Sequence, residues 1–172
     1  MQPEIFGLWP EAQLGLVYVT QVNNRISLTD FQPEQQQIES VIRQQFPKTE
    51  VVGQHPNIQA WRKAYKQFGS DPHDYRCSVE GLVRQVVKGN TIWGINPLVD
   101  LYNFICLKYV VPVGGEDCAK ISGEVRLMRA AGIEPFVRLG GTDNEPPDAG
   151  EVVYADQEGV LCRRWNWREA DR

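Results

Sequence analysis

The chain has 172 residues, of which 42% are hydrophobic and 23% charged, and its formal net charge is −4. These values are ordinary for a globular protein, and they exclude collagen-like, disordered and membrane-embedded classes. The negative charge argues against a dedicated nucleic-acid binder, because a polyanion is attracted by an excess of basic residues.

The length predicts one domain over residues 1–172. No apolar run approaches the roughly 20 residues that cross a bilayer, and the first residues lack the basic-then-apolar pattern of a signal peptide. We therefore expect a cytoplasmic protein that does not associate with membranes. Because the four cysteines are scattered without a CxxC pair, we also expect free thiols and no zinc site. These cysteines are Cys77, Cys106, Cys118 and Cys162.

The first predicted element is a strand over 14–21, which is rich in Val, Leu and Tyr and ends at an Asn-Asn turn. Three amphipathic helices follow, because apolar residues recur at intervals of three and four. Their expected ranges are 34–46, 56–68 and 78–89. Pro33 begins the first, Gly69 ends the second, and Ser78 is the expected N-cap of the third.

A fourth helix is predicted over 96–109, where Asn96 can cap and Pro97 suits the first helical position. Its residues are apolar nearly all the way round, so we expect the helix to be buried. Asp100 and Asn103 lie three residues apart and therefore share one face. A carboxylate and an amide removed from water need hydrogen-bond partners, so this pair is the first indication of a site.

The second half of the chain consists of short apolar runs separated by Gly and Pro, which predicts a sheet with turns. The expected strands are 109–113, 121–128, 136–139, 151–155 and 160–167. Helices followed by strands place the fold in the α+β or mixed α/β class, with the N-terminal helices packed on a mixed sheet.

The run from Cys162 to Arg168 is the most informative stretch, because alternate side chains of a strand point to opposite faces. One expected face carries Arg164, Asn166 and Arg168, and the other carries Arg163, Trp165 and Trp167. The tryptophans are either core residues or a stacking platform or pocket wall. If they are core, at least one residue of the polar face should reach a carboxylate. The candidate carboxylates are Asp100, Asp117 and Glu151.

Motifs for several kinds of catalysis are missing from the sequence. There is no G-x-S-x-G elbow, no P-loop, no GxGxxG after a strand and no HExxH, and neither His55 nor His73 lies in a motif. We therefore expect a protein that works without a catalytic triad, a metal ion or a nucleotide cofactor.

A set of short motifs occurs in a characteristic order along the chain. The set comprises Trp61-Arg62 with Tyr65 and Phe68-Gly69, Tyr75-Arg76, Ser78–Leu82, Asn96–Asn103, Gly115 with Asp117, Gly123, Gly150–Tyr154 with Asp156, and Cys162–Arg168. In these motifs the chain resembles the free-standing B3/B4-domain proteins, which are similar to the editing domain of the phenylalanyl-tRNA synthetase beta subunit. The resemblance covers about 56–168, preceded by a strand and a helix in 1–55. It departs at Ile133-Glu134, where the free-standing family more usually reads Gly-Glu.

The resemblance implies a mixed α/β fold with a central pocket, which in the synthetase hydrolyses tyrosine wrongly esterified to phenylalanine tRNA. Three hypotheses remain open, so whether the chain is an enzyme is also open. The first is a trans-editing deacylase that uses water as nucleophile without metal or triad. The second is a non-catalytic module that binds an amino acid or another small polar ligand. The third is a partner-docking protein that uses exposed Trp165 and Trp167.

The roles that the first hypothesis assigns are hypotheses as well. The catalytic candidates are Asp117, Glu151 and Asn103. The candidates for substrate binding are Arg76, Asn96, Asp100, Asn166 and Arg168. The expected partners are the 3′ end of an aminoacyl-tRNA, bound weakly, or a free amino acid. The oligomeric state is left open.

Overall fold

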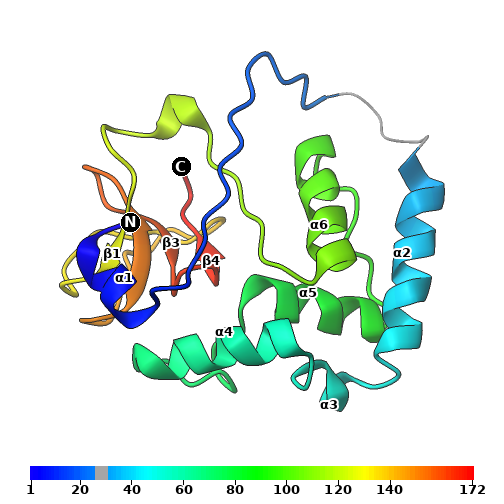
Figure 1. Cartoon of the computed structure of the whole chain (residues 1–172). Helices are drawn as coiled ribbons and strands as arrows, with labels where there is room; N and C mark the ends of the chain where they lie inside the picture. Colours follow the sequence, from blue (N-terminus) through cyan, green and yellow to red (C-terminus); the bar gives the residue numbers. More distant parts are fainter. Residues whose placement is uncertain (26–30) are drawn as a thin grey trace. The chain divides into compact units, whose positions relative to one another are not determined.

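The computed structural model describes residues 1–25 and 31–172 (Figure 1). Within these residues the chain forms six α-helices, one short 3-10 helix and one four-stranded sheet, which confirms the α+β class. The chain divides into two compact units, each of which is described by itself. Whether residues 1–172 form one domain depends on how these two units combine, so the single domain stays a prediction.

The first unit contains the sheet and is built from residues 1–16, 63–75 and 116–172. Its elements are α1 (Pro3–Leu8), η2 (Cys118–Lys120), β1 (Arg126–Arg129), β2 (Val152–Ala155), β3 (Val160–Arg163) and β4 (Arg168–Glu169). The strands lie in the order β1-β2-β3-β4, and each pairs with its neighbour in antiparallel fashion. The sheet is therefore antiparallel, where the sequence had suggested a mixed sheet.

The core of the first unit lies against this sheet. A buried cluster consists of Ala130, Phe136, Val153, Ala155 and Val160, with Met128 and Ala170 packed against it. Helix α1 packs beside β1, where Ile5 is fully buried and the backbone N–H of Gln2 donates to the carbonyl of Leu127 at 3.0 Å. The apolar residues of β1 to β3 thus fix the sheet that carries the site described below.

The second unit is helical and consists of residues 17–62 and 76–115. Its elements are α2 (Gln32–Gln45), α3 (Thr49–Val52), α5 (Ser78–Val87), α6 (Pro97–Tyr109) and the first part of α4 (Pro56–Gln67). Helix α5 packs against α2, α3 and α6 through the fully buried Val79, Val83 and Val86. All four predicted helices are confirmed to within two residues at each end. Ser78, however, is the first helical residue, and the N-cap position belongs to Cys77.

Helix α6 begins as the sequence predicts, since the side chain of Asn96 accepts a hydrogen bond from the backbone of Val99 at 3.0 Å. The helix is not buried on every side, because Leu101 is 47% exposed and Tyr109 57% exposed. It ends where Val110 takes a left-handed conformation with φ 52°. Residues 111–113 join no sheet, so the strand predicted at 109–113 does not form.

Other predicted strands are shorter than expected or do not form. Residues 14–21 join no sheet, and Val17 is 88% exposed, because a β-favouring composition makes a strand only where a partner strand is available. The strand predicted at 121–128 is confined to β1, and 136–139 makes only isolated bridges. The strand predicted at 151–155 is confirmed as β2.

All four cysteines are free thiols; Cys77, Cys106 and Cys162 are buried and Cys118 is exposed. Burial raises the pKa of Cys77 to about 12 and that of Cys106 to about 11. None of the described helices is long and apolar enough to pass through a membrane.

The cap of α6 generates the first test. Replacing Asn96 by Ala removes the acceptor for the backbone of Val99, so we expect the free energy of unfolding to fall by about 1 kcal/mol. Asn96→Ser, which keeps a capping oxygen, should lie within a few tenths of a kcal/mol of the parent. Urea denaturation measures both variants, and an unchanged midpoint for Asn96→Ala would contradict the role of the cap.

Candidate functional site

The site lies at a tight turn between β3 and β4. Strand β3 ends at Arg163, and the next two residues, Arg164 and Trp165, have left-handed backbones with φ 47° and 67°. For residues with a β-carbon this conformation costs roughly 1–2 kcal/mol each. Residues 164–167 therefore form a turn, and the prediction of one strand over 160–167 is wrong. The expected alternation of an arginine face and a tryptophan face fails with it.

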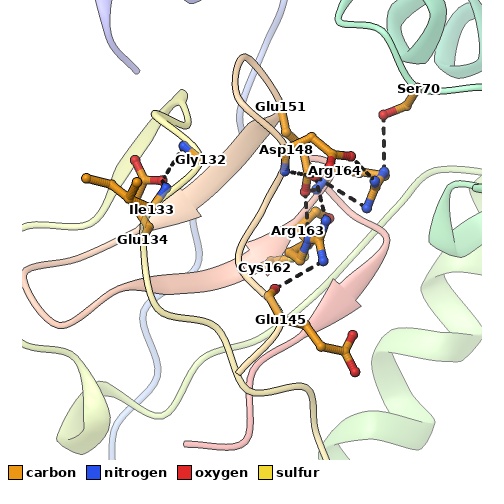
Figure 2. A network of polar contacts seen from close by, with 10 residues as sticks. All are labelled: Ser70, Gly132, Ile133, Glu134, Glu145, Asp148, Glu151, Cys162, Arg163 and Arg164. Carbon is orange, nitrogen blue, oxygen red and sulfur yellow. Dashed lines mark hydrogen bonds and ion pairs between the residues drawn. The ribbon is translucent and has the colours of Figure 1, made fainter. Parts of the chain in front are cut away.

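The carboxylate of Glu151 occupies the centre of the site and is 1% exposed (Figure 2). Arg163 holds it with two parallel hydrogen bonds, from Nε to Oε1 at 3.0 Å and from Nη2 to Oε2 at 2.8 Å. The backbone N–H of Arg164 donates to Oε1 at 3.0 Å, and that of Asp148 donates to Oε2 at 3.1 Å. Both oxygens of Glu151 are thus fully occupied by neighbouring donors.

A glycine before Glu151 makes this placement possible. Gly150 has φ 86°, and a β-carbon built there would come within 2.9 Å of Nη2 of Arg129. The Arg129 side chain also donates to the carbonyl of Gly150 at 3.2 Å. The Gly-Glu pair of the sequence therefore turns the chain into β2 with the carboxylate directed inward.

Arg164 is as deeply buried as Glu151, with 1% of its surface exposed. Its Nε donates to the hydroxyl of Ser70 at 3.1 Å, and its Nη2 donates to Asp148 at 2.7 Å. Nη1 lies 3.3 Å from Oε2 of Glu151 but is not directed at it for a hydrogen bond. The guanidinium also stacks on the ring of Tyr75, with 3.6 Å from its carbon to the ring centre.

The two adjacent arginines have opposite pKa shifts. Burial works to lower the pKa of Arg163, but the hydrogen bonds and charge of Glu151 outweigh it and raise that pKa above its ordinary value. Burial lowers the pKa of Arg164, and the positive charge of Arg163 adds to this effect, while the negative charge of Glu151 opposes it without reversing it. The arrangement places two buried cations against one buried carboxylate, and the second carboxylate, Asp148, is 77% exposed.

Close to this site, the carboxylate of Glu134 closes a turn of the chain. Glu134 accepts hydrogen bonds from the backbone N–H groups of Ala131, Gly132 and Ile133 at 2.7, 2.9 and 3.1 Å. The Ile133 side chain is 84% exposed, so the isoleucine in place of the usual glycine is accommodated by pointing into solvent (Figure 2).

The other predicted site residues of the first unit lie outside this cluster. Asn166 accepts a hydrogen bond from the hydroxyl of Tyr65 at 3.0 Å, and its side-chain nitrogen is buried with no hydrogen bond in the described residues. Arg168 is exposed and stacks over Trp167 at 4.6 Å. Asp117 is exposed and caps η2 by accepting from the backbone of Ala119 at 2.9 Å.

The expectation that one polar residue of 164, 166 and 168 reaches a carboxylate is confirmed by Arg164, which contacts Glu151. Arg168, in contrast, forms no ion pair within the part of the chain that the structure describes. Trp165 is 8% exposed and meets Trp9 edge-on at 5.0 Å. Its burial removes one of the two indoles on which the partner-docking hypothesis depended.

In the second unit, Asp100 and Asn103 are buried and hydrogen-bonded on one helix face, as predicted. Asp100 accepts from the backbone of Gly94 at 2.9 Å, and the amide of Asn103 donates to the carbonyl of Ile92 at 3.4 Å. Together with the capping Asn96, they hold the loop that leads into α6. Arg76 is exposed, with its Nε 3.9 Å from Glu80.

Sequence reasoning missed Ser70, Tyr75 and Asp148, each of which contacts Arg164. All three come from loops, where no periodicity shows which side chain turns inward. A usable signal was present in Arg163 and Arg164 themselves. Two adjacent arginines at the end of a buried strand need a nearby carboxylate, and the Gly-Glu pair supplies it.

A carboxylate on the neighbouring strand has an unusual environment. In the register of the sheet, Cys162 lies opposite both Tyr154 and Glu169, so the three side chains form a row on one face. Burial, followed by the negative charge of Glu116, raises the pKa of Glu169 to about 8. Glu169 is therefore protonated at neutral pH.

Comparison with known proteins identifies the family. The sequence model of the B3/4 domain matches residues 60–172, well over half of the chain. The chain therefore belongs to the B3/4 domain family. No curated protein and no solved structure matches it.

The central carboxylate generates the second test. Glu151→Gln leaves two buried guanidinium groups without their buried counter-charge, so we expect the free energy of unfolding to fall by about 3–5 kcal/mol. The matched control is Glu145→Gln, because Glu145 forms a half-exposed pair with Arg138 at 3.5 Å. That change should cost no more than about 1 kcal/mol. Equal denaturation midpoints for the two variants would contradict the central role of Glu151.

The raised pKa of Glu169 generates a pH test. A glutamate has an ordinary value of 4.5, and the folded value is about 8, so the folded protein binds the proton more tightly than the unfolded chain. The resulting stabilisation is complete below pH 4.5 and is lost as the pH rises through about 8. Glu169→Gln should remove this loss, and Glu158→Gln, a change of an exposed glutamate, should not. Melting temperatures between about pH 5 and pH 9 measure the slopes.

Proposed function

We propose that this protein is an editing hydrolase, which removes a wrongly attached amino acid from a tRNA. The observation that carries the proposal is the B3/4 domain match over residues 60–172. The matched segment contains the whole buried cluster around Glu151 and the exposed Asp117. The resemblance to the editing domain of the phenylalanyl-tRNA synthetase beta subunit supplies the substrate class, an amino acid esterified to the 3′ end of tRNA.

Ester hydrolysis of this kind requires that water add to the ester carbonyl and that the tRNA hydroxyl leave with a proton. An aminoacyl ester is labile, so positioning and preorganised hydrogen bonds supply much of the rate without a triad. In this proposal Glu151 is a positioning residue, because its oxygens are occupied by Arg163 and by backbone donors. Asp117 orients the water, since it is exposed and its Oδ2 makes no hydrogen bond within residues 1–25 and 31–172.

A second candidate function is favoured by the same observation about Glu151. With that carboxylate saturated, fewer groups remain to move a proton, and a module that only binds an amino acid would need none. The net charge of −4 also favours a small ligand over a polyanion. If the protein has this function, we expect titration calorimetry to show that it binds a free amino acid.

The experiment that separates the two functions is incubation with a panel of radiolabelled aminoacyl-tRNAs. The proposal expects release of at least one amino acid faster than the uncatalysed rate. Asp117→Asn should lower that rate on the order of 100-fold, because the amide keeps the cap on Ala119 but loses the charge that orients water.

Asp143→Asn is the matched control, because Asp143 is an exposed aspartate in a loop of the same unit. It should leave the rate within twofold of the parent, roughly the effect of a remote surface charge. If no aminoacyl-tRNA in the panel is deacylated above the background rate, the hydrolase proposal fails and the binding function remains.

A further inference from the structure

A second arginine cluster lies in the helical unit, apart from the Glu151 site. Its centre is Glu80 on α5, whose side chain is 0% exposed. Arg62 on α4 holds both carboxylate oxygens, from Nε to Oε2 at 2.9 Å and from Nη2 to Oε1 at 2.5 Å. Arg84, one helical turn after Glu80, donates from Nε to Oε1 at 2.8 Å. Arg76, four residues before Glu80, has its Nε 3.9 Å from the same oxygen.

The charges of this cluster do not balance. Three guanidinium groups converge on one carboxylate, and Arg76 and Arg84 alone already carry one positive charge more than Glu80 offsets. Within the described residues, no other carboxylate lies at ion-pair distance from Arg76 or Arg84. Like charges at such short range repel one another, and a structural pair between Glu80 and Arg62 alone would avoid that repulsion. The excess stands out in a chain whose net charge is −4.

The buried carboxylate fixes the arginines in place. Burial alone would raise the pKa of Glu80, but the hydrogen bonds of Arg62 and Arg84 outweigh it and hold the pKa below its ordinary value. Glu80 is therefore ionised and orients both groups. Gly53 leaves room for Arg62, because a β-carbon there would come within 2.7 Å of the guanidinium carbon.

Two arginines of the cluster keep hydrogen-bond donors that are available to a ligand. Arg84 uses only Nε, and Arg76 makes no hydrogen bond, so the terminal nitrogens of both are unused in the residues that the structure describes. Their side chains are 19% and 44% exposed, which makes them accessible to a ligand. Planar, oriented guanidinium groups match the spacing of phosphate oxygens and bind them with two parallel hydrogen bonds.

We propose that Arg84, which Glu80 orients, and Arg76, which lies beside the same carboxylate, form a binding site for a phosphate group. The phosphate belongs either to a polynucleotide backbone or to a free phosphate or small phosphorylated molecule. The site does not depend on ester hydrolysis, because it would bind phosphate in a purely binding protein as well. It also gives this acidic chain a local cationic surface of the kind that a polyanion requires.

The test uses the full chain with two probes, uncharged tRNA and inorganic phosphate. The variant Arg76→Gln/Arg84→Gln removes two charges from the cluster. The control Arg43→Gln/Lys48→Gln removes two charges elsewhere in the same unit, and Arg43 has the same 44% exposure as Arg76. Affinity for tRNA is measured by fluorescence anisotropy at several salt concentrations, and phosphate binding by the NMR signals of the arginine side chains.

We expect the cluster variant to bind tRNA roughly tenfold more weakly than the parent, while the affinity of the control stays within twofold of the parent. The slope of log affinity against log salt concentration should fall in the cluster variant by the equivalent of about two phosphate contacts. If inorganic phosphate shifts the signals of Arg76 and Arg84 but tRNA affinity is unchanged, the site stands and its ligand is a free phosphate group. The proposal is overturned if neither probe responds, or if the control loses as much affinity as the cluster variant.

The single variant Arg76→Gln tests the site without disturbing the fold, because Arg76 makes no hydrogen bond in the described structure. The single change should weaken tRNA binding about threefold, or reduce the shift caused by inorganic phosphate, with an unaltered melting temperature. No change with either probe would also overturn the proposal. A deacylation assay of the same variants reports separately on the proposed hydrolase.

Discussion

The contact between Glu151 and its two arginines is the interaction on which the C-terminal hairpin depends. Arg163 and Arg164 follow one another in the chain and are both buried, so their charges would repel each other without a buried carboxylate between them. The same carboxylate accepts the backbone N–H of Arg164, a residue in a left-handed conformation. One side chain therefore compensates both a charge and a strained backbone, and the turn that joins β3 to β4 forms around it.

The two arginine clusters show how the same residue types serve different ends. Around Glu151, the donors of Arg163 and Arg164 are directed inward and the carboxylate is enclosed. Around Glu80, Arg62 and Arg84 both donate to the carboxylate, and Arg76 and Arg84 keep terminal nitrogens that make no hydrogen bond in the described residues. The difference lies in exposure. A buried cation is directed toward its partner, whereas a cation with part of its side chain in solvent, as in Arg76 (44%) and Arg84 (19%), is available for a ligand.

The helices could be predicted because each rests on local signals. The apolar spacing of residues 56–68 and the cap at Asn96 act within a few residues, and both have the expected form. The strands were harder, because pairing depends on residues far apart in the sequence. Residues 14–21 have a strand-like composition but find no partner in the described chain.

The residues of the candidate site could likewise be predicted where their placement depends on nearby residues, and not where it depends on distant ones. The burial of Asp100 and Asn103 followed from helical spacing. The central role of Glu151 required knowing that Arg163 and Arg164 face inward around a turn. Nothing in an alternating pattern indicates that Arg164 and Trp165 adopt left-handed backbones. The backbone N–H of Arg164 is held by Glu151, thirteen residues away in the chain.

The distribution of the cysteines makes the native protein suitable for site-specific chemistry. Cys77, Cys106 and Cys162 are buried, and burial raises the pKa of each, so they remain protonated and shielded. Cys118 is exposed and directly follows Asp117, the residue proposed to orient water. A thiol-reactive fluorophore should therefore attach at one position without any engineered cysteine. Its emission would report on ligands that approach the carboxylate of Asp117.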